Sequence, residues 1–138
     1  MRAAESDVTA GWDVLVVDDE PVVGEAIRRI LGAEGLRVAV ALDAGSALVH
    51  PALAACRLVL CDLMLPDRPG TELCSAIRVT RPELPVVAIT GYATTVQNAR
   101  AMEAGASDFL AKPFDEEELL AVVRRALRAD ASGKEIRP

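Results

Sequence analysis

Residues 57–70 read Arg57-Leu58-Val59-Leu60-Cys61-Asp62-Leu63-Met64-Leu65-Pro66-Asp67-Arg68-Pro69-Gly70. The apolar run from Leu58 to Cys61 does not alternate with polar residues, which is typical of a strand that is buried on both faces. It ends abruptly at Asp62 and is followed by a loop with two prolines and a glycine. In open parallel sheets, ligands bind at the carboxyl ends of the strands. The stretch therefore predicts a buried parallel strand with Asp62 at the edge where a ligand site would form.

Apolar runs of this kind alternate with helical patterns along the whole chain. Strands are predicted over residues 14–17, 36–42, 58–61, 86–89 and 108–111, and helices over residues 21–34, 43–49, 70–80, 94–104 and 115–128. This alternation predicts an α/β fold of the (βα)5 type, a doubly wound five-stranded parallel sheet covered by helices on both faces. Residues 1–11 are expected to be a flexible leader, 12–128 the domain, and 129–138 a tail or the start of a linker.

Several residues mark where the predicted helices begin and end. Gly35 is expected in the left-handed conformation that follows a helix, and Asp43 is expected to cap the next helix. Asp115 and Glu118 have the spacing of a capping box at the start of the last helix, with arginines in its last turn. Pro51 should break or kink the short second helix.

The composition limits the classes of function. With 138 residues, of which 51% are apolar and 26% charged, the chain fits one soluble globular domain. A formal net charge of −6 argues against DNA or RNA as a direct partner. No stretch approaches the roughly 20 apolar residues of a membrane span. The first residues also lack the apolar core of a signal peptide.

The cysteines and the single histidine do not form a metal-binding pattern. Cys56, Cys61, Cys74 and His50 lack the paired spacing of zinc ligands. The cysteines are expected to be small buried apolar residues, which favours a reduced, cytoplasmic compartment.

Polar residues of complementary type follow four of the predicted strands. Asp18 and Asp19 follow the first strand, Asp62 the third, Thr90 the fourth and Lys112 the fifth. Carboxylates that converge at one edge repel each other unless a cation compensates, and an all-oxygen set suits Mg²⁺. A metal ion, an ammonium and a hydroxyl would hold a phosphoryl group, which a carboxylate could attack. Each residue alone is explained more simply as a turn or cap residue, but four such strand ends together favour a functional site.

Four segments carry these residues: Val16-Val17-Asp18-Asp19-Glu20, Leu60-Cys61-Asp62-Leu63-Met64-Leu65-Pro66, Ile89-Thr90-Gly91-Tyr92, and Ala104-Gly105-Ala106-Ser107-Asp108-Phe109-Leu110-Ala111-Lys112-Pro113-Phe114. With them, the chain resembles the receiver domain of two-component response regulators over about residues 12–128. The resemblance implies a flavodoxin-like fold with the strand order 2-1-3-4-5. It also implies a signalling module that is not an enzyme and only assists its own phosphotransfer and dephosphorylation.

The resemblance also implies roles at the site. Asp62 would be the phosphoacceptor and would take a phosphoryl group from a histidine kinase or a phosphotransfer protein. Asp19 would bind Mg²⁺ directly and Asp18 mainly through water, with Asp62 and the backbone carbonyl of Met64 as further ligands. Lys112 would pair with the carboxylate or with the phosphoryl oxygens.

Other implied roles concern the response to phosphorylation. Thr90, Gly91 and Lys112 would contact the phosphoryl group, and Thr90 with Phe109 would form a hydroxyl and aromatic switch. The surface of residues 93–128 would carry the change to an output domain, a downstream protein or a second copy in a phosphorylation-dependent homodimer. Neither nucleic acid nor a membrane is implied as a direct partner. The Lys112-Pro113 bond is a candidate for the cis form.

Three residues depart from the usual family pattern. Pro51 shortens or kinks a helix, Arg57 stands where an acid commonly precedes the apolar run, and Pro69 replaces an acid before the loop glycine.

Two other functions stay open. The first alternative is a Mg²⁺-dependent aspartyl-phosphate phosphatase or phosphotransferase. Such enzymes commonly carry a second acid two residues beyond the nucleophile, where this chain has Met64. The second is a pseudo-receiver that binds partners without phosphate, against which the intact acid pair and Lys112 argue.

Overall fold

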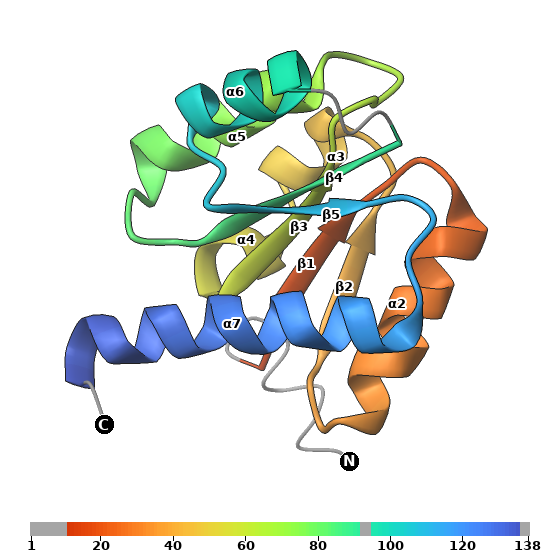
Figure 1. Ribbon diagram of the computed structural model, residues 1–138, viewed down its shortest axis with the longest axis vertical. Coiled ribbons are helices and arrows are strands. Elements are labelled where there is room, and N and C mark those ends of the chain that lie inside the picture. Colours follow the sequence, from red (N-terminus) through yellow and green to blue (C-terminus); the bar gives the residue numbers. More distant parts are fainter. Residues whose placement is uncertain (1–10, 92–94, 136–138) are drawn as a thin grey trace.

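A computed structural model describes residues 11–91 and 95–135, which form one five-stranded parallel sheet between two layers of helices (Figure 1). The strands are β1 (Val14–Val17), β2 (Val38–Ala41), β3 (Leu58–Asp62), β4 (Val86–Thr90) and β5 (Asp108–Ala111). Their order across the sheet is β2-β1-β3-β4-β5, and each neighbouring pair is parallel. The predicted fold class and strand order are confirmed.

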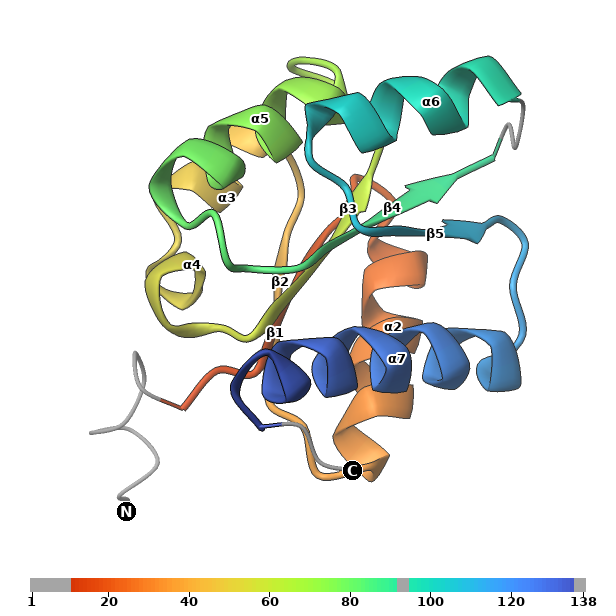
Figure 2. The same cartoon turned by 60° about the vertical axis from the view of Figure 1, so that its left-hand side comes forward.

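The helices cover both faces of the sheet. They are α2 (Pro21–Ala33), α3 (Ala44–Leu48), α4 (Pro51–Ala55), α5 (Gly70–Thr80), α6 (Thr95–Ala104) and α7 (Glu116–Glu135). Figure 2 shows α2 and α7 on one face and the other four helices on the opposite face. Because both faces of the sheet are covered, the strands are apolar on both sides and do not alternate with polar residues. In β1, for example, Leu15 packs into the core under α3, α4 and α5, while its neighbour Val16 packs into the core under α2 and α7.

Most of the predicted helix ends are confirmed. The side chain of Asp43 accepts a hydrogen bond from the Ser46 N–H at 2.7 Å and so caps α3. Asp115 and Glu118 exchange the two reciprocal bonds of a capping box, at 2.8 and 2.9 Å. Gly35 has a positive φ of 89° directly beyond α2. The predicted cis bond between Lys112 and Pro113 and the burial of the three free cysteines are confirmed as well.

The region around Pro51 differs from the prediction. Pro51 does end the preceding helical segment, but it also begins a second short helix, α4. Proline suits the first turn of a helix because its missing N–H has no partner there. The ring of His50 caps this helix, since its Nδ1 accepts a hydrogen bond from the Ala52 N–H at 3.0 Å.

The prediction that arginines occupy the last turn of the last helix is wrong, because α7 continues past Arg128 to Glu135. Two of these arginines form ion pairs with other elements. Arg124 lies 3.0 Å from a carboxylate oxygen of Glu34, and Arg125 lies 2.8 Å from one of Asp108.

The second strand is shorter than predicted. Its first predicted residue, Leu36, lies beyond α2 but is still bound to the end of that helix, because its N–H donates to the Leu31 carbonyl at 3.1 Å. The strand therefore begins only at Val38.

Part of the predicted organisation lies outside the described residues. This applies to residues 1–10 of the expected leader, residues 136–138 of the expected tail, and residues 92–94, which include Tyr92 and the first positions of the expected readout surface. Among the helices of residues 11–91 and 95–135, none is long and apolar enough to cross a membrane.

Candidate functional site

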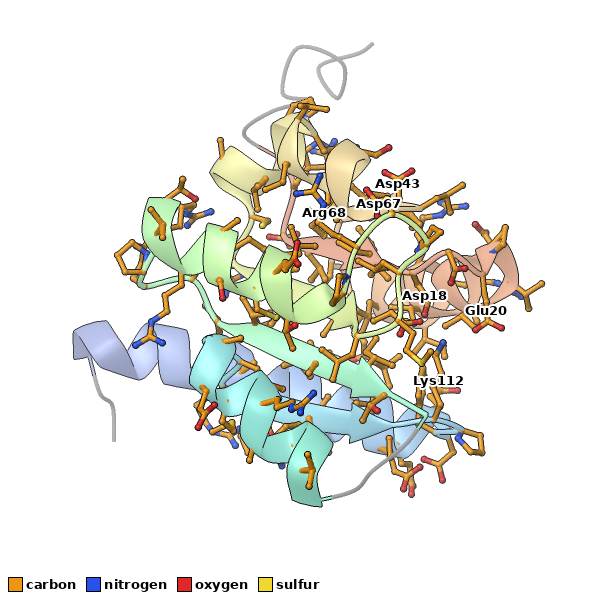
Figure 3. All side chains as sticks on the ribbon, turned by 90° about the horizontal axis from the view of Figure 1, so that it is seen from above. Asp18, Glu20, Asp43, Asp67, Arg68 and Lys112 are labelled. Atoms are coloured by element: carbon orange, nitrogen blue, oxygen red, sulfur yellow. The ribbon has the colours of Figure 1, made fainter. Side chains whose placement is uncertain are left out.

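The predicted site residues come from the carboxyl ends of four strands. Asp18 directly follows β1, Asp62 and Thr90 are the last residues of β3 and β4, and Lys112 directly follows β5. Because these strands are neighbours and run parallel, their ends meet at one edge of the sheet. Figure 3 looks down on the molecule and shows Lys112 approaching Asp18 and Glu20.

Lys112 lies among three carboxylates. Its Nζ is 2.8 Å from Glu20 Oε1, 3.0 Å from Asp62 Oδ2 and 3.1 Å from Asp18 Oδ2. Oxygens of the three acids lie within 4.8 Å of one another. Burial by itself lowers the pKa of Lys112, but the interactions with the carboxylates of Glu20, Asp62 and Asp18 outweigh it and raise the pKa above its usual value. The ammonium therefore stays charged at neutral pH.

Asp18 is fully buried. Its Oδ1 accepts a hydrogen bond from the Glu20 N–H at 2.9 Å. Its Oδ2 forms the ion pair with Lys112 at an angle outside hydrogen-bonding geometry, and no other described residue donates to it. Burial raises the pKa of Asp18 and the charge of Asp62 adds to the rise, while the Glu20 N–H and Lys112 oppose it.

Asp62 is held by two donors at the end of β3. Its Oδ1 accepts from the Met64 N–H at 2.8 Å, and its Oδ2 accepts from Lys112 Nζ at 3.0 Å. The next residue, Leu63, donates its N–H to the Ile89 carbonyl at 3.0 Å and so continues the pairing of β3 with β4. Asp62, which is 5% exposed, is therefore fixed by both its backbone and its side chain.

Glu20 belongs to this group although the sequence analysis did not select it. It is the N-cap residue of α2, but its side chain makes no cap hydrogen bond, and the carboxylate instead pairs with Lys112. The available signal was a third acid directly after Asp18 and Asp19 and before the helix start at Pro21.

Asp19 and Met64 lie on the outer side of the site. Asp19 is exposed and is not one of the three acids whose oxygens meet. It lines a shallow hollow of about 510 Å³ together with Met64 and the loop that follows β3. The Met64 side chain is exposed, while its N–H is held by Asp62. The assignment of Asp19 and of the Met64 carbonyl as metal ligands stays a prediction.

The residues predicted for the switch lie on β4 and β5. Thr90 is buried, and its carbonyl accepts a hydrogen bond from the Lys112 N–H at 2.8 Å. Phe109 is half-buried and packs against a cluster that includes Ala88 and Ala101. Gly91 is exposed directly after Thr90.

The donor set fits a divalent cation. Three carboxylates face one ammonium, so the negative charge around Lys112 is in excess. The side-chain ligands on offer are oxygens, as hard divalent ions prefer. Asp18 Oδ2 is buried without a hydrogen bond from any residue in the described ranges, so it has a free position for a ligand.

Comparison of the sequence with known proteins gives close matches. The family model for the response regulator receiver domain matches residues 14–124. The response regulator MprA of Mycolicibacterium vanbaalenii is 39% identical over 115 residues, which are 83% of this chain and 50% of MprA. The chain thus spans about half the length of the curated relatives it matches.

Solved structures are similar as well. A CheY-like response regulator receiver domain protein from Methanospirillum hungatei has a TM-score of 0.82 at 30% identity, covering 88% of this chain and 98% of that chain. The BeF3-activated receiver domain of DrrB, a protein of Thermotoga maritima, has a TM-score of 0.77 at 36% identity, covering 84% and 97%.

Proposed function

This chain belongs to the family of response regulator receiver domains, which are modules of two-component signalling, and on that premise we propose that Asp62 accepts a phosphoryl group. The donor would be the phosphohistidine of a histidine kinase or of a phosphotransfer protein. The observation that carries the proposal is the position of Asp62 at a buried strand end, with Lys112 Nζ 3.0 Å from its Oδ2.

In the proposed transfer, an oxygen of Asp62 attacks the phosphorus of the phosphohistidine. The P–N bond breaks, the imidazole leaves with the bonding electron pair and takes up a proton, and an acyl phosphate remains on Asp62. Lys112 is already paired with the attacking carboxylate and would move to the new phosphoryl oxygens, so a positive charge is in place where negative charge develops.

The metal of this site is proposed to be Mg²⁺. Asp18, Asp19, Asp62 and the backbone carbonyl of Met64 would hold it, and when bound it would neutralise the phosphoryl oxygens and the excess of carboxylate charge. Glu20, whose carboxylate lies in the same group, is expected to keep Lys112 close to the site before phosphorylation.

The phosphorylated state would be transmitted through Thr90, Gly91 and Phe109. Lys112 is joined by its backbone N–H to the Thr90 carbonyl, so a movement of Lys112 toward the phosphoryl group would also pull on the end of β4. The surface of residues 93–128 would then present the change to an output domain, a downstream protein or a second copy of the chain. We propose a cytoplasmic location for this exchange.

The test is phosphorylation by a small donor. Incubation with phosphoramidate and Mg²⁺ should add one phosphoryl group to the wild-type chain, measured by intact mass spectrometry, and none to Asp62→Ala. Asp43→Ala is the matched control, because it removes a carboxylate that lies in the cap of α3 and makes no contact with Lys112. It should be labelled like wild type.

Equal labelling of wild type and Asp62→Ala would refute the assignment of Asp62. Steady release of phosphate from an external phosphate ester, dependent on Asp62, would favour the phosphatase over the signalling module.

A further inference from the structure

The loop between β3 and α5, residues 63–69, carries the backbone of Met64 past the site. At its base, Met64 and Pro69 form an isolated antiparallel bridge, and the Gly70 N–H donates to the Leu63 carbonyl at 2.9 Å. These two contacts close the base of the loop, and Leu65 is buried in the core. The outer part, residues 66–68, is left to be fixed by other groups.

Asp67 fixes the outer part of this loop to another element. Its Oδ1 accepts a hydrogen bond from the Ala44 N–H at 3.0 Å, and its Oδ2 accepts one from the Gly45 N–H at 2.9 Å. Both donors belong to the first turn of α3, more than twenty residues earlier in the chain. Figure 3 shows Asp67 next to Asp43 at this helix start.

Capping of α3 does not by itself explain these bonds. The helix has its own cap, since Asp43 accepts the Ser46 N–H at 2.7 Å. A second carboxylate at the same place adds negative charge beside Asp43, yet Asp67 is stably ionised there. Its pKa is lowered, first by the Ala44 N–H and then by the Gly45 N–H, with Arg68 contributing less. The contact of Asp67 is therefore a link between the loop and α3.

This link connects two sides of the phosphorylation site. The segment that leads into α3 leaves β2 at Ala41, whose carbonyl accepts the Asp18 N–H at 3.0 Å. On the other side, the loop held by Asp67 begins with Met64, whose N–H donates to Asp62. The segments next to Asp18 and Asp62 are thus connected to each other through Asp67 and the start of α3.

We propose that Asp67 is a positioning residue for the phosphorylation of Asp62. By tying the loop to α3, it sets the place of the Met64 backbone, both the N–H that holds Asp62 and the carbonyl that would bind the metal. The inference rests on the proposed function, since it assigns Asp67 a part in the same phosphorylation.

The test measures how labelling depends on Mg²⁺. The rate of phosphorylation by phosphoramidate is recorded over a series of Mg²⁺ concentrations for wild type, Asp67→Ala, Asp67→Asn and Asp43→Ala. Asp67→Ala should need about 10-fold more Mg²⁺ for half-maximal rate, the order of loss typical when a residue that orients a metal ligand is removed. Asp67→Asn keeps one acceptor oxygen and should fall between Asp67→Ala and wild type.

Asp43→Ala separates positioning from the stability of α3. It removes the helix's own cap, so it should lower the melting temperature at least as much as Asp67→Ala, yet leave the Mg²⁺ dependence as in wild type. An unchanged Mg²⁺ dependence in Asp67→Ala, or an equal shift in Asp43→Ala, would overturn the inference. Failure of the proposed function itself is distinct, because the wild-type chain would then not be labelled at any Mg²⁺ concentration.

Discussion

The buried carboxylate of Asp18 works against folding at neutral pH. It is fully buried, and its partners are one backbone N–H and an ammonium that it shares with Glu20 and Asp62. Burying an ionised carboxylate is costly unless its charge is compensated, and here the compensation is incomplete. A neutral side chain at this buried position would stabilise the fold more than the ionised Asp18 does. The charge of Asp18 therefore indicates a functional requirement.

The first prediction concerns Asp18→Asn, measured by urea denaturation in the presence of a chelator. The pKa of Asp18 is higher in the folded than in the unfolded chain, so ionisation of wild type lowers the free energy of unfolding as pH rises through the folded value. The side chain in Asp18→Asn does not ionise, so this variant does not lose free energy of unfolding in this way. Asp18→Asn should therefore be more stable than wild type at pH 7, by on the order of 1 kcal/mol, and the gain should shrink toward pH 4.

Asp67 provides a control in which the dependence of stability on pH has the opposite sign. Its pKa is lowered in the folded chain, so its ionised form stabilises folding above the unfolded pKa of 3.8, and that contribution is lost as the pH falls. Asp67→Asn should therefore be less stable than wild type at pH 7, with the difference disappearing in acid. A gain for Asp18→Asn that did not depend on pH would contradict the role given to its charge.

The helices and strands that could be predicted from the sequence are those whose residue pattern has a regular physical cause. Strands buried on both faces must be apolar without alternation, as in the run from Leu58 to Cys61, and helix ends need particular cap residues such as Asp43. The five-residue helix α4 is too short to show an apolar period, and it was missed. The contact between Asp67 and α3 could not be predicted, because it joins residues 22 and 23 positions apart across two loops.

The second prediction concerns the junction of β3 and α5, where Gly70 lies against the site. A Cβ on Gly70 would collide with the carbonyl oxygen of Asp62 and would lie 2.6 Å from the Leu63 Cα. Both are backbone atoms that cannot turn away. Gly70→Ala should therefore lower the free energy of unfolding by about 1–3 kcal/mol and slow labelling of Asp62. Chemical denaturation and the phosphoramidate assay measure the two effects.

The matched control for this change is Gly32→Ala, the same substitution in another helix. A Cβ on Gly32 would meet nothing within 4 Å, so alanine there should raise the free energy of unfolding by about 0.5–1 kcal/mol. Two variants that lost stability equally would contradict the steric argument.

The site exists only when the whole sheet has folded, because its residues come from different strands. Asp18, Asp62 and Lys112 are far apart in the sequence. They meet because β1, β3 and β5 belong to one parallel sheet. The sequence could predict that they share an edge, since parallel strands all end on the same side. It could not predict that Glu20 turns back to join Lys112, because that depends on the direction of one side chain at the start of α2.

The last prediction follows from this dependence of the site on the fold. A ligand that binds only the folded chain stabilises it, by about 2.7 kcal/mol when its concentration is 100 times its dissociation constant. Mg²⁺ should therefore raise the melting temperature of wild type, measured by calorimetry against NaCl at matched ionic strength.

Two variants serve as controls for this effect of Mg²⁺. Asp43→Asn, which keeps a side chain that can cap α3 outside the site, should respond like wild type. The double variant Asp18→Asn with Asp62→Asn should lose the response, because both buried carboxylates of the cluster become neutral amides. Since the double variant also lacks the repulsion between these acids, it should start from a higher melting temperature without metal. If Mg²⁺ raised the melting temperatures of wild type and the double variant equally, the ion would be binding elsewhere on the acidic surface.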